Sequence, residues 1–323
     1  MLLEINNLTV EFSSMQDKIV ALQNVSLAIN DGEIVGIVGE SGSGKSVTAL
    51  SILGLLEKNA RIASGTIQYK GTNLLTLDKK GLQSLRGKEI GMVFQEPMTA
   101  LHPTMRIGDQ LAEVIHRHRN ISYREAYQQA VLSLAEVRIN DPELVARKFP
   151  FELSGGMRQR VVIALAMSSP PDLLIADEPT TALDVTIQNE ILKLMQELAA
   201  KRGTSIMLIT HDLGVVSQVC QRVVVMYAGE VVETGMTEEV LQHPRHPYTR
   251  ALIGALPDLA DPGQPLSAIP GDAPDLRNRP KGCAFASRCP HSLPICQEDH
   301  PVLELVSAAS TTHYVSCWGR ETG

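Results

Sequence analysis

The stretch Gly39-Glu40-Ser41-Gly42-Ser43-Gly44-Lys45-Ser46 decides the fold, because it matches the phosphate-binding pattern G-x-x-x-x-G-K-[ST] at every fixed position. Residues 33–38 (EIVGIV) predict a buried strand before it, and residues 46–56 (SVTALSILGLL) predict a helix after it. In such a unit the glycines turn backbone N–H groups onto phosphate oxygens, and the helix N-terminus adds positive charge. Lys45 adds a full positive charge, and the Ser46 hydroxyl can bind Mg²⁺. The residues expected to hold the phosphates of a nucleotide are Gly39, Ser41, Gly42, Ser43, Gly44, Lys45 and Ser46.

Composition limits the kinds of partner this chain can have. Its 323 residues suffice for one large domain with an extension, or for two modest domains. A net charge of −7 gives no basic surface, so we predict no nucleic-acid partner. No apolar run approaches the roughly 18 residues of a spanning helix, and the first residues lack the basic and apolar segments of a signal peptide. We therefore expect a cytosolic protein that meets a membrane only through partners.

A second nucleotide-binding element is predicted at the end of an apolar strand. Residues 173–176 (LLIA) precede the adjacent carboxylates Asp177 and Glu178. In phosphate-loop enzymes the first such acid supports Mg²⁺, and the next can orient or deprotonate the attacking water. Acidic strand ends are also common in ordinary α/β proteins. Because the phosphate loop stands in the same chain, we assign Asp177 to Mg²⁺ and Glu178 to the general base.

A third element is the sequence Leu153-Ser154-Gly155-Gly156-Met157-Arg158-Gln159-Arg160, which opens a predicted helix running to about Ser168. Ser154 can cap this helix, and the two glycines expose N–H groups at its positive end. No strand precedes this second anion site. Two phosphate-facing helix starts in one chain indicate a nucleotide closed between two protomers.

The rest of the pattern places these motifs on an α/β framework. Short strands are predicted before the phosphate loop, and residues 97–150 change to helical character. In that block Ser122 and Glu125 form a predicted capping box, and Asp141-Pro142 predicts a helix start with Asp141 as N-cap. A helix over 187–202 and a strand over 204–210 then indicate parallel βαβ units.

Taken together, residues 1–255 resemble the ATP-binding-cassette ATPases. The motifs of that family stand here in its order: GESGSGKS, FQEP with Gln95, LSGGMRQR, IADEP, the loop Ala182-Leu183-Asp184, and Ile209-Thr210-His211-Asp212. The resemblance implies an α/β fold with a RecA-like parallel core, an antiparallel β subdomain and a helical subdomain. We expect a cassette over 1–257, with the helical subdomain at about 97–168.

The resemblance also implies roles for single residues. Two cassettes pack head to tail, and each ATP lies between one phosphate loop and the other signature loop. His211 then contacts the γ-phosphate, although a histidine in such a turn is more often a cap or a surface residue. Phe12 is expected to stack on adenine, although a strand phenylalanine is equally often core. The implied catalytic residues are Lys45, Gln95, Glu178 and His211, the Mg²⁺ ligands are Ser46, Gln95 and Asp177, and the further nucleotide contacts are Phe12, Gln95, Ser154, Gly155, Gly156, Asp184 and His211.

Three segments resemble one branch, the ATPase subunits of dipeptide, oligopeptide and nickel importers: residues 94–110, 243–252 and 282–318. This implies a peripheral protein at the cytoplasmic face of the membrane. Its implied partners are a second, related ATPase in a heterodimer, two integral membrane permease subunits and a substrate-binding protein. Residues 97–106 lie where the family receives a coupling helix of the permease. The transported solute stays open between dipeptides, longer peptides, glutathione-like molecules and nickel chelates.

Four of the five cysteines fall in the last 41 residues, at Cys283, Cys289, Cys296 and Cys317. In a reducing compartment such clustering favours metal or cluster ligation over disulfides. The 5, 6 and 20 intervening residues match neither a ferredoxin run nor paired zinc knuckles, so the residues alone predict a four-thiolate site without naming its metal. The resemblance implies a [4Fe-4S] cluster; structural zinc and no metal stay open. We expect a linker at 258–281 within a cysteine-bearing extension over 258–323, and Cys220 in the core.

Three other readings compete with the importer. A cassette ATPase without a membrane partner usually fuses two cassettes or carries coiled coils, and neither is present. An exporter component often carries spanning helices. A regulatory cassette that binds ATP without hydrolysing it would lack the acid or the histidine, whereas Glu178 and His211 are both present.

Overall fold

The computed structural model describes residues 1–13, 18–181, 183–255, 269–306 and 312–319. They form two compact units. Unit 1 comprises residues 1–29, 34–76 and 209–323, and unit 2 comprises 30–33 and 77–208. The residues expected to form the C-terminal extension belong to unit 1. The boundary proposed at 257/258 falls in the segment 256–268, outside the described residues, and stays a proposal.

Unit 1 contains an antiparallel sheet with the strand order β2-β1-β4-β5. Its strands are β1 (Leu3–Ser13), β2 (Lys18–Ile29), β4 (Ala60–Tyr69) and β5 (Thr72–Asn73). Along β1 alternate apolar residues such as Leu3 and Ile5 are fully buried, which is the pattern of a sheet with one covered face. The strands predicted before the phosphate loop include the long strands β1 and β2.

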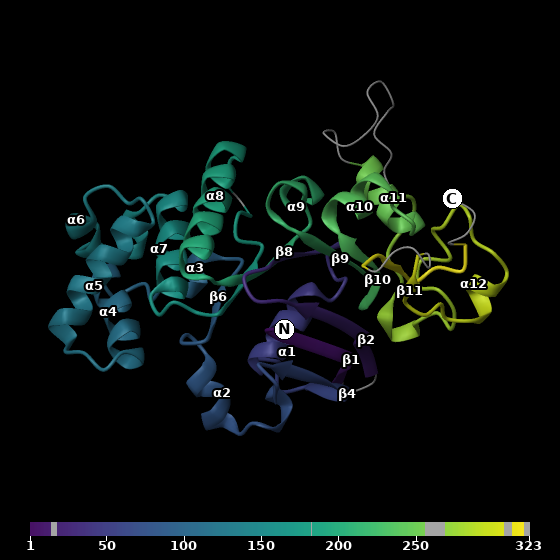
Figure 1. Ribbon diagram of the computed structural model, residues 1–323, viewed down its shortest axis with the longest axis horizontal. Helices are drawn as coiled ribbons and strands as arrows, with labels where there is room; N and C mark the ends of the chain where they lie inside the picture. The colour runs from purple at the N-terminus through teal and green to yellow at the C-terminus, as the bar shows by residue number, and fades with distance from the viewer. Residues whose placement is uncertain (14–17, 182, 256–268, 307–311, 320–323) are drawn as a thin grey trace. The chain divides into compact units, whose positions relative to one another are not determined.

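A second set of strands in unit 1 carries the phosphate loop. In β3 (Ile34–Val38) all five residues are buried, and it pairs in parallel with β9 (Arg222–Tyr227). On the other side of β9 the order is β10 (Glu230–Met236), then β12 (Tyr314–Val315), then β11 (Glu304–Leu305), and each of these pairs is antiparallel. The extension thus adds two short strands to the sheet that holds the phosphate loop (Figure 1).

The helices of unit 1 follow the strands. They are α1 (Lys45–Leu53), η1 (Leu74–Thr76), α9 (Leu213–Val219), α10 (Thr237–Gln242), α11 (Pro247–Gly254), η3 (Leu276–Asn278) and α12 (Ile295–Glu298). Helix α1 ends earlier than predicted because Gly54 adopts a left-handed conformation and donates to the last carbonyls. Cys220 is 8% exposed, as the sequence predicts for a core residue.

Unit 2 combines parallel strands with a helical block. In the sheet, β6 (Ile90–Val93) pairs in parallel with β7 (Leu173–Asp177), and β8 (Ser205–Thr210) is next to β7. Its helices are α2 (Lys79–Leu85), α3 (Pro97–Ala100), α4 (Ile107–His118), α5 (Tyr123–Glu136), α6 (Pro142–Ala146), η2 (Pro150–Glu152), α7 (Gly155–Met167) and α8 (Val185–Arg202). Helices α4 to α7 gather at one end of Figure 1 and contact one another.

Two helix-start predictions had different outcomes. Ser122 forms the capping box with Glu125, as predicted. Asp141 is the N-cap residue of α6 and Pro142 stands in its first turn, as predicted, but the Asp141 side chain makes no cap hydrogen bond. The reason is its backbone: an N-cap side chain reaches the helix amides from an extended conformation, whereas Asp141 is left-handed at φ +50°.

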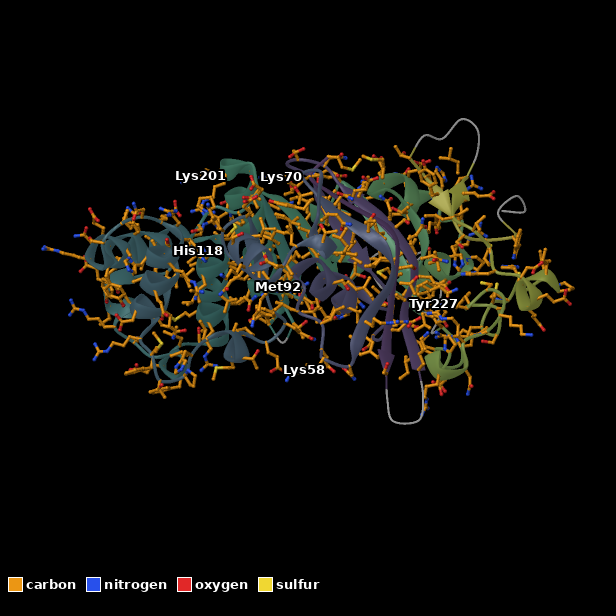
Figure 2. All side chains as sticks on the ribbon, turned by 90° about the horizontal axis from the view of Figure 1, so that it is seen from below. Lys58, Lys70, Met92, His118, Lys201 and Tyr227 are labelled. Atoms are coloured by element: carbon orange, nitrogen blue, oxygen red, sulfur yellow. The ribbon has the colours of Figure 1, made fainter. Side chains whose placement is uncertain are left out.

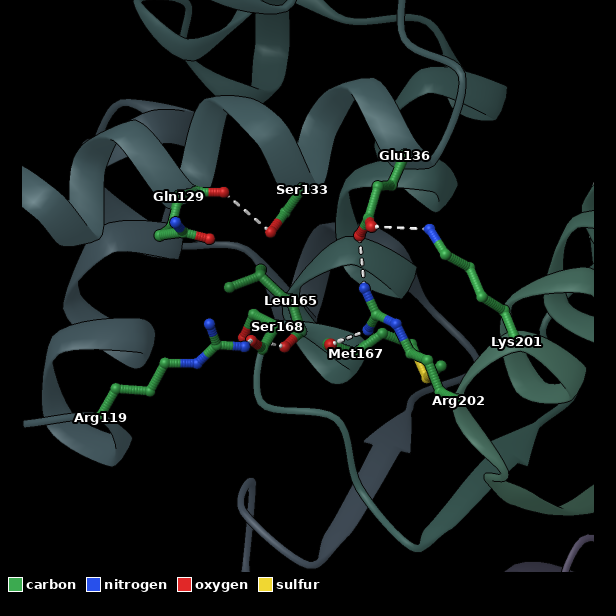
Figure 3. A network of polar contacts seen from close by, with 9 residues as sticks. All are labelled: Arg119, Gln129, Ser133, Glu136, Leu165, Met167, Ser168, Lys201 and Arg202. Carbon is green, nitrogen blue, oxygen red and sulfur yellow. Dashed lines mark hydrogen bonds and ion pairs between the residues drawn. The ribbon is translucent and has the colours of Figure 1, made fainter.

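Charged side chains bind the carbonyl groups at the C-terminal end of helix α7 (Figure 3). Arg119 donates to Ser168 O at 2.7 Å, and Arg202 donates to Met167 O. Arg202 also pairs with Glu136. Positive groups on the last carbonyls of a helix satisfy their hydrogen-bonding capacity and complement the helix dipole. These contacts therefore fix the C-terminal end of the helix whose N-terminus carries the signature loop.

No helix in the described part of the chain is both long and apolar enough to cross a membrane.

Candidate nucleotide site

The phosphate loop requires glycine at its two ends. A Cβ on Gly39 would lie 2.1 Å from Met226 O, and one on Gly44 would lie 2.6 Å from the Leu22 side chain. Both glycines also have positive φ, at +153° and +102°. The close packing and the backbone conformation together explain why the loop leaves β3 and enters α1 only through glycines.

Lys45 is held inside the loop. Its ammonium donates to Gly39 O at 2.7 Å and to Glu40 O at 2.9 Å. The whole residue is only 6% exposed. Ser43 is buried and accepts from Gly229 N through its carbonyl at 3.0 Å, which ties the loop to the β9–β10 turn. Ser46 is exposed at the start of α1, where a hydroxyl ligand for Mg²⁺ would be needed.

Two further expected residues of unit 1 lie at strand ends. His211 directly follows β8 and is exposed, while the next residue, Asp212, caps α9 by accepting from Gly214 N at 2.8 Å. The residue that caps this helix is therefore Asp212 and not His211. Phe12 is half-buried near the end of β1, opposite Ile19 of β2 and Ala60 of β4. Its stacking on adenine stays a prediction.

In unit 2 the acid pair and the glutamine come together. Asp177 ends β7 and is 6% exposed. Gln95 Nε2 donates to Glu178 Oε2 at 3.1 Å, and the Thr181 hydroxyl donates to the same oxygen at 2.8 Å. The structure therefore joins Gln95 and Glu178, 83 positions apart, at the carboxyl ends of neighbouring strands.

Glu178 and Thr181 show features that sequence reasoning missed. Glu178 has φ +47°, which is strained for a residue with a side chain. Thr181, whose hydroxyl donates to Glu178, is not among the residues that the sequence predicted for the site. Its position three residues after the acid, in the loop that continues to Asp184, is the signal that identifies it.

The signature segment presents Gly155 to solvent, while Gly156 is half-buried. Ser154 caps α7 by accepting from Met157 N at 3.4 Å, and Ser154 and Gly155 are exposed. A Cβ on Gly156 would lie 3.1 Å from Ile187, so the loop packs against the start of α8. Asp184 caps α8 by accepting from Ile187 N at 3.0 Å. The helix start predicted at Ser154 is confirmed.

The four C-terminal cysteines line one cavity in unit 1. This cavity has a volume of about 70 Å³, and its wall also includes Phe285, Trp318 and two arginines, Arg245 and Arg250. Cys283 N donates to Cys296 O at 2.8 Å, and β12 leads to Cys317. The thiols brought together are Cys283, Cys289, Cys296 and Cys317.

Burial affects the charge of three of these thiols. It raises the pKa of Cys283 to about 12 and raises the pKa of Cys289 and of Cys317. Thiols of this kind are protonated at neutral pH unless a bound cation displaces the protons. Across the described residues, no three His, Cys, Asp or Glu side chains are placed to hold a metal ion as they stand.

Comparison with known proteins identifies the family. Residues 22–181 match the model of the ABC transporter family, and residues 232–296 match that of the oligopeptide/dipeptide transporter C-terminal region. The oligopeptide transport ATP-binding protein OppD of Bacillus subtilis is 50% identical over 98% of this chain and 88% of its own length. The chain belongs to the ABC transporter ATP-binding proteins of the oligopeptide and dipeptide branch.

Other members of the ABC transporter family support this placement. The dipeptide transport ATP-binding protein DppD of Bacillus subtilis is 46% identical over 98% of this chain and 94% of its own length. A solved dimeric ATP-binding cassette, bound to ADP and Pi in a post-hydrolysis state, has a TM-score of 0.66 at 30% identity and covers 73% of this chain and 98% of its own. The predicted cassette fold and the predicted transporter branch are both confirmed.

Proposed function

We propose that this chain is the ATP-hydrolysing subunit of a peptide importer. The observation that supports hydrolysis is the hydrogen bond from Gln95 Nε2 to Glu178 Oε2 at 3.1 Å, because a base that activates water must be held in a fixed orientation. Similarity to oligopeptide and dipeptide transport proteins along 98% of the chain favours this function over a repair factor, an exporter or a non-hydrolysing cassette. Peptides are the cargo we infer, rather than nickel chelates.

ATP hydrolysis in this proposal uses the residues of the phosphate loop and the polar residues around Glu178. Lys45 and the loop amides offset phosphate charge in a loose transition state, and Ser46, Gln95 and Asp177 are the expected holders of Mg²⁺. Bound Mg²⁺ would neutralise the charge of the β- and γ-phosphates. Glu178, oriented by Gln95 and Thr181, accepts a proton from the attacking water. His211 contacts the γ-phosphate.

A second cassette completes the site in this proposal. The exposed Ser154 and Gly155 of one chain close over the nucleotide held by the phosphate loop of the other, with Gly156, Asp184 and Phe12 as further contacts. The dimeric, ADP-bound state of a solved relative supports this arrangement. The companion is a related ATPase. Two permease subunits and a substrate-binding protein complete the importer, and the chain is peripheral at the cytoplasmic face.

The test is a single substitution in the base. Glu178→Gln keeps the shape and the hydrogen-bonding oxygen but cannot accept a proton. We expect ATP turnover by the complex with its companion to fall by about 10² to 10⁴, with MgATP binding retained. Phosphate release and equilibrium binding measure the two effects. Glu143→Gln, on an exposed carboxylate of α6, is the matched control. Near-normal turnover of Glu178→Gln would remove the assigned base.

We also propose that the four cysteines hold a [4Fe-4S] cluster. All four cysteines line one cavity, which supports one shared ligand, and the resemblance to importer ATPases is the reason to propose a cluster rather than zinc. Arg245 and Arg250 on the wall can offset the negative charge of four thiolates. When bound, the cluster would cross-link the extension. A cassette over 1–257 and an extension over 258–323 remain part of this proposal.

Iron content tests the cluster. The chain purified without oxygen is expected to contain iron and sulfide and to be brown. Cys289→Ser is expected to lose most of the iron, because one of four ligands is gone. Cys220→Ser is the control, since Cys220 packs against Gly36 and not in the cavity. A folded wild-type chain without iron would contradict the cluster, and one zinc per chain would support the structural-zinc alternative.

A further inference from the structure

One arginine of the C-terminal extension reaches the phosphate loop. Arg288 donates from Nη1 to Glu40 Oε2 at 2.8 Å and from Nη2 to Glu40 Oε1 at 3.1 Å. This is a two-point pair between residues 248 positions apart, and Glu40 is the second residue of the loop. Paired N–H···O bonds of this kind fix direction as well as distance. The guanidinium therefore holds the Glu40 carboxylate in one orientation.

The guanidinium is itself firmly anchored. Its remaining N–H groups donate to Pro270 O at 2.8 Å, to Tyr227 Oη at 3.1 Å and to Ile269 O at 3.5 Å, so all five donors have an acceptor. The side chain is only 6% exposed, against 29% for Glu40. An exposed ion pair contributes little, whereas a buried, fully bonded one is costly to break. This pair is part-buried and every guanidinium N–H group is bonded, so it lies closer to the second kind.

A tyrosine holds the backbone of the same loop residue. Glu40 N donates to Tyr248 Oη at 2.8 Å, and Tyr248 is fully buried. Its ring lies 4.6 Å from that of Tyr227, which is labelled in Figure 2, and 5.4 Å from that of Phe285. Phe285 also lines the cysteine cavity. Tyr248 of α11 thus binds the amide of Glu40, and Arg288 of the extension binds its carboxylate.

Glu40 is also joined to the phosphate-binding groups. Lys45 Nζ donates to Glu40 O at 2.9 Å, and Gly39 precedes Glu40 directly. A free carboxylate here would repel an incoming polyphosphate, while a neutralised one would not. A shift of the Glu40 backbone would also move the carbonyl that receives the lysine.

We propose that Arg288, with Tyr248, is a positioning residue for the phosphate loop, so that the C-terminal extension sets the affinity of this chain for nucleotide. Arg288 neutralises Glu40 and fixes the loop, while its neighbour Cys289 belongs to the cavity wall. Such coupling is reciprocal, so bound nucleotide in turn steadies the extension around residues 283–289.

A double-mutant cycle on the full chain tests this, with MgADP binding measured by titration calorimetry. Arg288→Met keeps the apolar stem but leaves Glu40 charged, and we expect the dissociation constant to rise on the order of tenfold, within the usual range of coupling between sites. Adding Glu40→Gln to Arg288→Met removes that charge, and we expect most of the affinity to return. Arg288→Lys, which keeps the charge but not the two-point geometry, is expected to lie between wild type and Arg288→Met.

Controls separate positioning from mere stability. Arg277→Met removes an arginine that pairs with Asp275, two residues earlier in the same segment, and is expected to leave the MgADP dissociation constant unchanged. Tyr248→Phe removes only the hydroxyl that accepts from Glu40 N, and is expected to weaken binding in a chain that still folds. If Arg288→Met does not fold, Arg288→Lys and Tyr248→Phe carry the test. The proposal is overturned if the folded variants melt lower but bind MgADP as wild type, or if Glu40→Gln does not rescue Arg288→Met.

Discussion

At the residue scale, strain and close packing are concentrated in the nucleotide site. Glu178 adopts φ +47° while two side chains hold its carboxylate. A residue that keeps a costly conformation is usually held there by its surroundings, as Gln95 and Thr181 do here. The sequence placed Glu178 at the end of an apolar strand, where the structure has it, and its role as the base stays a prediction. The sequence could not predict the backbone conformation, because that depends on contacts made by residue 95.

Gly39 offers a sharp test at this scale. Gly39→Ala would place its Cβ 2.1 Å from Met226 O, so the loop or β9 must move. We expect MgADP binding to weaken by at least about tenfold, equivalent to roughly 1.4 kcal/mol. Gly254→Ala, at the end of α11 with nothing within 4 Å of the added Cβ, is the control and is expected to bind as wild type. Unchanged affinity in Gly39→Ala would contradict the packing argument.

At the element scale, helix starts were easier to predict than helix anchors. Ser122 and Ser154 cap α5 and α7 as their sequence neighbours predicted, because a cap depends on residues three positions away. The anchoring of α7 by Arg119 and Arg202 could not be predicted, because these residues lie 49 and 35 positions from the carbonyls they bind. Long-range contacts leave no local pattern.

The two cations around Glu136 in Figure 3 give a matched pair of variants. Arg202→Met loses a part-buried pair and the bond to Met167 O, and we expect a loss of about 1 to 3 kcal/mol in the free energy of unfolding. Lys201→Met loses an exposed contact of 3.4 Å, with the lysine 68% exposed, and we expect a loss below about 1 kcal/mol. Urea denaturation measures both. Equal losses would show that the carbonyl bond does not stabilise α7.

At the scale of the whole molecule, the extension is continuous with the sheet of unit 1. Strand β12 pairs with β10, where Glu233 is fully buried and accepts from Arg245 N, His246 N and His313 Nε2 at 2.7 to 2.9 Å. Burial lowers the pKa of His246 to about 4, so this imidazole is neutral near pH 7. The sequence predicted a separate cysteine-bearing tail after a linker. It could not predict that the tail reaches Glu40, because Arg288 carries no recognisable partner in the sequence.

The central claim is that ATP held by residues 39–46 of this chain is sealed by residues 154–156 of a companion. The most direct measurement is the structure of the Glu178→Gln complex, companion included, with MgATP. The account predicts a nucleotide triphosphate against Lys45 and the loop amides, facing the companion's signature loop. A complex with saturating MgATP and no nucleotide at this loop would contradict it.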